Sequence, residues 1–513
     1  MSHSMAAETL ADALALGLLV YVLRRAFTDR HEGDHPPGPT GWPIIDNVFD
    51  MPTSHGWRTF AQWGEKWGDI VFLNLFGTRT VILNSFDVAN EMLDNKSAVY
   101  SDRPVFPVCG EIMGWNFVVA FQQYGPHWRE MRRLFSQTVG THKSLVKLAP
   151  NLEHLAYDFI RRVAANPASL TYEVHRFTAA SSLKFIYGYT VNGEDDELVK
   201  IVETAVEEFA IATAPGAFLA DIFPILTYVP AWFPGAQWKR TAQAWEKHTE
   251  MLCSVPYDFA KAQMSAGTAM PSFVTLNLDD SADLKREALI KDAAASLYAG
   301  AFLTVSAMRS FFLAMMCYPE VQKKAQAEID RIIGSGRLPS VIDRDQLPYI
   351  RALCSEVLRW QPVAPLGMPH RLSQDDVHGS YVFRKGTVVL TNIWKMLHDP
   401  ERYSRPEHFD PDRFIPKEGS EPETDPRQMA FGFGRRLSDT IIYLGSQLAE
   451  MSLFLICAVS LAAFEISKPV VDGRVVEPSM EYTNGTISHP FEFQCSIKLR
   501  SSKVEALLFV AYD

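Results

Sequence analysis

The chain has 513 residues, of which 47% are apolar and 12% aromatic, enough to bury a large core. Lysine and arginine number 49 against 60 aspartates and glutamates, and the net charge of −11 argues against nucleic acid as a partner. The six cysteines are scattered and form no C-x-x-C pair, so the sequence predicts reduced thiols in a protein that faces the cytosol.

An apolar segment opens the chain. Residues 10–23 are apolar except for Asp12, and two arginines follow them. The segment is short for a complete membrane span, but a cleaved signal peptide, the alternative, normally begins with positive residues that this chain lacks. Arginines favour the cytosolic side of a membrane, so we expect residues 1–27 to form an uncleaved anchor helix in the endoplasmic reticulum membrane. Residues 28–40 then form a linker with a stiff proline-rich elbow, and residues 41–513 form the globular domain on the cytosolic side.

The periodicity of apolar residues changes along the globular part. Residues 71–76 and 80–84 have strand character around Gly77-Thr78, which predicts a hairpin, and helical periodicity then dominates to about residue 330. Residues 209–235 mix apolar side chains with four prolines; this segment either touches a membrane, covers an entrance, or is a buried loop. Strand character returns over residues 376–390. The sequence therefore predicts a mainly α fold of the α+β kind, a helix-rich globule with a smaller β region.

Two motifs in the second half of the chain carry a family resemblance. Glu356 and Arg359 stand three residues apart, where they can pair on one helix face. Arg413, in the motif Phe-Asp-Pro-Asp-Arg-Phe, can join them, since planar guanidinium groups suit a buried ionic network. Residues 431–436 form a glycine-rich aromatic loop before a long apolar helix. In this order the motifs resemble those of the cytochrome P450 family, and the overall pattern is similar to its membrane-anchored fungal members of secondary metabolism.

The resemblance implies the cytochrome P450 fold and a haem-dependent monooxygenase. It also implies that an apolar small molecule, terpenoid- or polyketide-like, is oxidised with electrons from NADPH-cytochrome P450 reductase, because the chain has no visible flavin- or nicotinamide-binding region. By the same resemblance, the contacts of haem are Trp128, Arg132, His370, Arg371, Phe431, Gly434 and Arg436. The substrate pocket is expected to be lined by Phe106, Phe117, Ala301, Phe302, Val363 and Leu366.

The chain departs from the family pattern at two places. The family's loop holds a cysteine whose thiolate binds the haem iron, but Ser438 stands near that position, and Leu437 to Leu444 has the character of a replaced stretch. The family's acid and alcohol, which deliver protons to bound oxygen, are replaced by Phe302-Leu303. Thr304 is the remaining candidate for a catalytic hydroxyl, and the segment is otherwise typical of a plain apolar core helix.

Three functions stay open. The first is a P450 monooxygenase whose sequence as written carries splicing or gene-model damage, or a recent lesion. The second is a haem-poor pseudoenzyme that acts as a binding or scaffold protein, and the third is a P450 fold repurposed for non-redox isomerisation or cyclisation. If the chain is a monooxygenase, Arg129, Arg132 and Arg133 are candidates for a basic docking patch for the reductase; the alternative is an ordinary solvated helix face.

Overall fold

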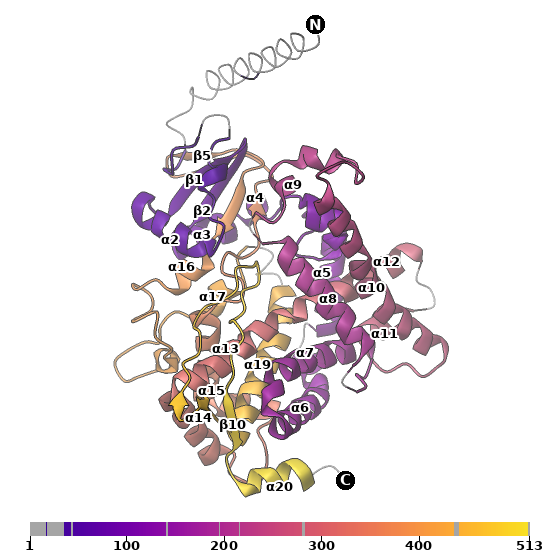
Figure 1. Cartoon of the computed structure of the whole chain (residues 1–513), viewed down its shortest axis with the longest axis vertical. Helices are drawn as coiled ribbons and strands as arrows, with labels where there is room; N and C mark the ends of the chain where they lie inside the picture. The colour runs from indigo at the N-terminus through magenta and orange to yellow at the C-terminus, as the bar shows by residue number, and fades with distance from the viewer. Residues whose placement is uncertain are drawn as a thin grey trace.

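A computed structural model of the chain (Figure 1) describes residues 17, 35–42, 45–139, 142–193, 195–214, 216–279, 283–434 and 441–510. The predicted membrane anchor, except for Gly17, lies outside these residues, and so do Arg436 and Ser438 of the glycine-rich loop.

Helices account for most of the described chain, and most of the long ones lie in the centre and on the right of Figure 1. The long helices are α2 (Gly56–Trp67), α5 (Pro126–Val139), α6 (His142–Ala165), α7 (Leu170–Tyr187), α8 (Glu197–Ala212), α10 (Gln237–Ser265), α12 (Leu284–Ala301), α13 (Leu303–Cys317), α14 (Pro319–Ile332), α15 (Pro348–Trp360) and α19 (Ile441–Ala463). The shorter ones are α3 (Phe86–Ala89), α4 (Ser97–Tyr100), α9 (Leu219–Ile222), α11 (Phe273–Asn277), α16 (Ile393–Leu397), α17 (Arg427–Ala430) and α20 (Ser502–Val510). Single turns of 3₁₀ or π type are η2 (Val48–Asp50), η3 (Asn90–Asn95), η4 (Pro107–Ile112), η5 (Trp115–Phe117), η6 (Pro167–Ser169), η7 (Pro224–Tyr228), η8 (Val341–Gln346) and η9 (Pro411–Phe414).

Two helices that are apolar on all sides form the centre of the core. In α13 nearly every side chain is buried, and in α19 every residue from 451 to 463 is buried. A helix without a polar face is stable only in an interior. Among the described residues, the helical stretch Leu284–Cys317 is long and apolar enough to cross a membrane, but 72% of its apolar window is buried inside the molecule. We therefore assign α12 and α13 to the core.

The strands form one small mixed sheet and three hairpin-like pairs. The main sheet has the order β1 (Ile70–Leu75), β2 (Thr78–Leu83), β6 (Val388–Thr391) and β3 (His370–Arg371), with β2 and β6 parallel. The two-stranded pairs are β4 (Asp376–His378) with β5 (Tyr381–Phe383), β7 (Phe464–Ser467) with β10 (Ser496–Leu499), and β8 (Val470–Val471) with β9 (Arg474–Val475). The predicted mainly helical α+β architecture with a smaller β region is confirmed.

The predicted hairpin of β1 and β2 is present, with its turn one residue earlier than expected. Leu75 pairs with Thr78, so the turn residues are Phe76 and Gly77 rather than Gly77 and Thr78. Both have positive φ, 49° and 89°, which matches the two-residue turns that suit the twist of a hairpin. Glycine tolerates this conformation freely, whereas Phe76 is held in it by the strand pairing on either side.

The apolar segment after α8 lies on the surface. Ile225 is 75% exposed, Tyr228 85% and Trp232 78%, so the alternative of a buried loop is wrong for this part of residues 209–235, whereas Phe218 and Ala220 are buried. The Phe223 ring contacts the Phe76 ring of the β1–β2 turn, with 4.8 Å between the ring centroids. An exposed apolar surface therefore lies beside the small sheet.

Candidate functional site

Glu356, Arg359 and Arg413, named here the ionic triad, meet in the interior where α15 contacts η9. Glu356 accepts hydrogen bonds from Nε and Nη2 of Arg359 at 2.7 and 2.8 Å and from Nε of Arg413 at 3.2 Å. Its Oε1 also accepts from the backbone N–H of Asp410 at 2.8 Å. Glu356 and Arg359 have 0% exposure, and Arg413 is buried as well. Hydrogen-bonded pairing of this kind is what makes buried charges tolerable.

Trp128 and Arg132 face each other one turn apart on α5. The helix begins at Pro126, as proline at the first helical position predicts. The Arg132 guanidinium lies 4.4 Å from the centroid of the Trp128 ring, and both side chains are buried. Because Arg132 is only 7% exposed, it cannot belong to a surface docking patch, and that prediction is wrong for this residue. Arg129 and Arg133 of the same helix are exposed.

β3 brings the next two predicted residues close to α5. His370 is buried, and its Nδ1 lies 2.8 Å from the carbonyl oxygen of Tyr100. Arg371 donates from Nη2 to Asp102 at 2.8 Å, so a carboxylate of the protein already neutralises its charge. The other oxygen of Asp102 accepts from the backbone N–H of Tyr124 at 3.1 Å, and the Tyr124 ring packs on Trp128. Asp102 therefore joins β3 to the start of α5.

Arg103 is a buried residue of this region that the sequence reasoning did not select. Its Nη1 donates to the carbonyl oxygens of Met368 and Pro369 at 2.6 Å each. These contacts hold the loop before η4 against the strand that carries His370. The signal in the sequence was the pair Asp102-Arg103 placed directly before a proline in an apolar loop.

The start of the glycine-rich loop is tightly enclosed. Phe431 ends α17 and is half-buried. Gly434 has a φ of 84°, and a Cβ atom on it would come within 2.9 Å of the carbonyl oxygen of Leu93 and 3.9 Å of His370. Its N–H donates to Asp94 of η3, whose carboxyl pKa is raised by burial. The structure thus places Gly434 beside His370, and sequence reasoning missed Asp94.

The segment that replaces the family's acid and alcohol interrupts a long helix. The sequence predicted a continuous apolar helix, but α12 ends at Ala301 and α13 begins at Leu303. Thr304 donates its hydroxyl hydrogen to the carbonyl oxygen of Ala301 at 2.7 Å. The Thr304 hydroxyl therefore serves as the hydrogen-bond donor to a backbone carbonyl at the point where the helix is interrupted. Phe302 is buried and its ring packs on Tyr298.

The predicted pocket residues divide between two apolar clusters. Phe106, Phe117, Phe302 and Val363 belong to or pack against the main core, whereas Leu366 packs against the sheet with β1 and β2, so Leu366 does not share their cluster. Sequence reasoning missed Phe209 of α8, Trp115 and Phe121. The rings pack closely there: Phe106 stacks on Phe121 with 4.4 Å between the centroids, and Phe209 lies tilted against Trp115 at 4.6 Å. We call the group of Phe106, Trp115, Phe117, Phe121 and Phe209 the aromatic cluster.

The donors of Trp128 and Arg132 on α5 suit the carboxylates of a haem, but the chain does not fit a thiolate-bound iron. Trp128 and Arg132 offer only N–H groups, which bind carboxylates well. None of the six cysteines lies in residues 431–450, where Ser438 stands. Burial raises the pKa of Cys109 and of Cys457, which also contacts Cys354, so both are held as thiols. A serine hydroxyl cannot replace thiolate as an electron donor.

Comparison with known proteins agrees with these motifs. The cytochrome P450 family model matches residues 36–494. Cytochrome P450 monooxygenase 208 of Postia placenta is 54% identical over 507 residues, covering 99% of this chain and 98% of the relative. Cytochrome P450 monooxygenase claR of Ampulloclitocybe clavipes is 42% identical, covering 98% and 93%, and Cytochrome P450 monooxygenase ppsD of Aspergillus oryzae is 37% identical, covering 92% and 90%. The chain therefore belongs to the cytochrome P450 family, is similar to its fungal members, and has the family's helix-rich fold with a smaller sheet region.

Proposed function

We propose that this protein descends from a P450 monooxygenase that oxidises an apolar small molecule, terpenoid- or polyketide-like, with electrons from a separate NADPH-cytochrome P450 reductase. The observation that carries the proposal is the intact buried framework of the ionic triad together with the stacked Trp128 and Arg132. Gradual loss of function removes residues of this kind one at a time, whereas the departures here are confined to the glycine-rich loop and the interruption at Phe302. The names of the similar proteins, all monooxygenases, support the same proposal.

The chain with Ser438 is expected to bind such a molecule without oxygenating it. In this family the cysteine thiolate donates the electron density that promotes O–O cleavage, and Ser438 does not supply it. The active form would then carry a cysteine at the loop, which a splicing error or recent lesion has removed. The aromatic cluster is the part of the core best suited to hold an apolar molecule, because stacked rings give a large apolar surface with few polar atoms.

A pseudoenzyme that binds the same kind of molecule is the second candidate. Two observations favour it. The Thr304 hydroxyl is hydrogen-bonded to the Ala301 carbonyl oxygen, and Phe302 and Leu303 stand where the family has its acid and alcohol. A proton relay needs a titratable group within hydrogen-bond reach. No observation favours the third possibility, an isomerase or cyclase.

We propose that residues 1–27 anchor the protein in the endoplasmic reticulum membrane, with the globular domain, residues 41–513, on the cytosolic side. The exposed apolar side chains at Ile225, Tyr228 and Trp232 support this. Phe223, just before them in the chain, contacts Phe76 of the β1–β2 turn, and β1 and β2 lie in the half of the molecule where the described chain enters from the linker (Figure 1). Exposed apolar side chains gathered on one segment suit a contact with a partner or a membrane.

Reduced, carbon-monoxide-treated absorption spectra of two forms test the proposed function. The chain as it stands should not give the band of thiolate-ligated haem, whereas a form in which a short Cys-Pro link replaces Leu437 to Leu444 should give it. Product formation should remain poorly coupled in the repaired form, because Phe302 and Leu303 persist. A thiolate band from the unrepaired chain, or none from the repaired one, would refute the proposal, and transcripts encoding a cysteine in the loop would favour the lesion over the pseudoenzyme.

A further inference from the structure

A cavity of about 300 Å³ lies between α6 and α7, and no residue predicted for the haem or the substrate lines it. The two helices run side by side in the lower part of Figure 1. One face of each helix lines the cavity, as the spacing of the lining residues shows. These are residues 151, 154, 155, 158, 159 and 162 of α6 and residues 173, 176, 177, 180 and 184 of α7. The volume is at the lower end of the range of about 300–1,000 Å³ for small-molecule sites.

Arg176 of α7 lines this cavity, and its contacts differ from those of Arg359 and Arg413 in the ionic triad. It is only 8% exposed, and its Nε and Nη1 atoms are buried without a hydrogen-bond acceptor. No hydrogen bond or ion pair of Arg176 occurs anywhere in the part of the chain that the structure describes. Arg359 and Arg413, by contrast, are each bonded to a carboxylate. Because a buried charge normally needs a partner, Arg176 is expected to take an acceptor that does not belong to the described residues.

The other charges of the cavity leave room for one negative group. Arg162 pairs with Asp158 at 2.9 Å across one turn of α6, so these two cancel. Lys184 donates to the Thr190 hydroxyl at 2.7 Å, and no carboxylate pairs with it in the described residues. Glu173 also lines the cavity and offsets one of the two remaining cations. The cavity is thus net positive in a chain whose net charge is −11.

The lining also has polar members, Asn151, His154, Tyr189 and Thr190, and an apolar part that defines the class of ligand. Phe159 and Phe177 pack on each other with centroids 6.1 Å apart, and Leu155, Ala180 and Val191 complete the apolar part. The planar fork of a guanidinium matches a carboxylate in two-point contact. We propose that this cavity binds a small organic carboxylate, with its charged group on Arg176 and a short apolar body against Phe159 and Phe177.

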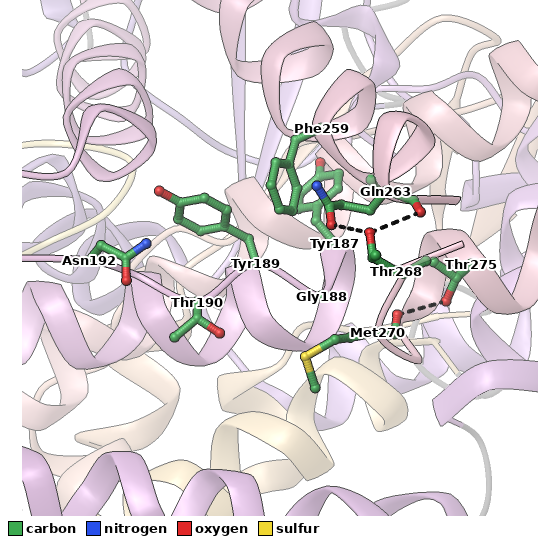
Figure 2. A pocket seen from close by; sticks show the side chains of 12 residues that line it. Tyr187, Gly188, Tyr189, Thr190, Asn192, Phe259, Gln263, Thr268, Met270 and Thr275 are labelled. Carbon is green, nitrogen blue, oxygen red and sulfur yellow. Dashed lines mark hydrogen bonds between the residues drawn. The ribbon is translucent and has the colours of Figure 1, made fainter. Parts of the chain in front are cut away.

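A neighbouring cavity provides the contrast. Figure 2 shows this second cavity, of about 270 Å³, between the segment of Gly188 to Asn192 and the segment that holds Thr268 and Met270. Tyr189 and Thr190 line both cavities. The lining of the second cavity is entirely neutral, and its Thr268 hydroxyl is bonded to Gln263. Of these two cavities, only the one between α6 and α7 therefore favours an anion, and Thr268 offers a control position next to it.

Calorimetric titration and thermal unfolding of the full-length chain in a neutral detergent test the proposal, with sodium hexanoate, 1-hexanol and inorganic phosphate as probes. Hexanoate should raise the melting temperature with concentration, since a ligand that binds only the folded state stabilises it. Hexanol lacks the charge and phosphate lacks the apolar body, so both should bind more weakly. In Arg176→Gln the dissociation constant of hexanoate should rise by at least about tenfold, the loss expected for a charge-assisted hydrogen bond.

Three further variants complete the test. Arg176→Lys keeps the charge without the planar fork and should bind with intermediate affinity. Arg331→Gln removes an exposed charge on α14 outside both cavities, and Thr268→Val alters the neutral cavity; both should bind hexanoate as the parent does. Without ligand, Arg176→Gln should be no less stable than the parent, because the removed charge has no partner in the described chain. The assignment would be overturned if either Arg176 variant bound hexanoate as tightly as the parent does. It would also be overturned if the parent bound hexanol or phosphate as tightly as hexanoate, or if Arg176→Gln were less stable than the parent.

Discussion

Replacing Arg359 by alanine would break the ionic triad at its most connected member. Nε and Nη2 of Arg359 bind Glu356 at 2.7 and 2.8 Å, and Nη1 donates to the carbonyl oxygen of Leu397 at 3.1 Å. Neither charged side chain has any exposed surface. In Arg359→Ala, Glu356 keeps Arg413 and the Asp410 amide as donors but loses its two shortest contacts to a cation.

The expected loss of unfolding free energy is about 3–5 kcal/mol, the cost of removing one partner from a buried ion pair. An exposed pair contributes at most about 1 kcal/mol. Arg384→Ala is therefore a matched control, because Arg384 meets Asp375 at 3.1 Å with both side chains largely exposed. Urea unfolding followed by tryptophan fluorescence gives both values on the full chain, and Arg359→Ala should unfold at clearly lower urea than Arg384→Ala.

A double variant separates the ion pair from the packing of the arginine. Since Glu356 and Arg359 are in direct contact, the cost of Glu356→Ala with Arg359→Ala should be smaller than the sum of the two single costs. Additive costs would show that the two charges do not support each other. Unfolding of Arg359→Ala at the same urea concentration as the parent would refute the assigned role of the triad.

Further expectations concern the loop, the pH dependence and the reductase. Gly434→Ala should destabilise the chain by about 1–3 kcal/mol in a thermal unfolding assay, because the added Cβ would lie 2.9 Å from the Leu93 carbonyl oxygen. Gly432 also has positive φ, but a Cβ there would meet no atom within 4 Å, so Gly432→Ala should destabilise the chain less in the same assay. Equal destabilisation by the two variants would contradict the steric argument. Burial, together with nearby Arg309, lowers the pKa of His489 to about 4. The unfolded histidine takes up its proton near pH 6.5, so stability should fall between about pH 6.5 and 4, and His489→Gln should flatten that part of the profile. If Arg133, exposed on α5, meets the reductase, electron transfer to the cysteine-repaired chain should slow as salt rises and less so in Arg133→Gln; rates indifferent to salt would exclude the patch.

Local patterns in the sequence were enough for the features that depend on near neighbours. The β1–β2 hairpin follows from strand character on either side of Gly77, and the start of α5 follows from Pro126. The pairing of Glu356 with Arg359 also follows from their spacing of three on one helix. In each case the groups that interact are separated by a few residues, so the chain has little choice of partner.

Tertiary structure alone decided which partner each distant polar group meets. Arg371 is bound by Asp102, 269 residues away in the chain, which the spacing of motifs could not indicate. Arg132 is buried although Arg129 and Arg133 on the same helix are exposed, because the packing of that helix selects one face. The interruption at Phe302 likewise depends on how α12 and α13 fit the surrounding core. Arg176 lies on a helix whose sequence gives no sign of a site, and its buried position between α6 and α7 exists only once the two helices pack. Periodicity determines which element forms, whereas the burial of a charge and the choice of its partner depend on contacts between elements far apart in the sequence.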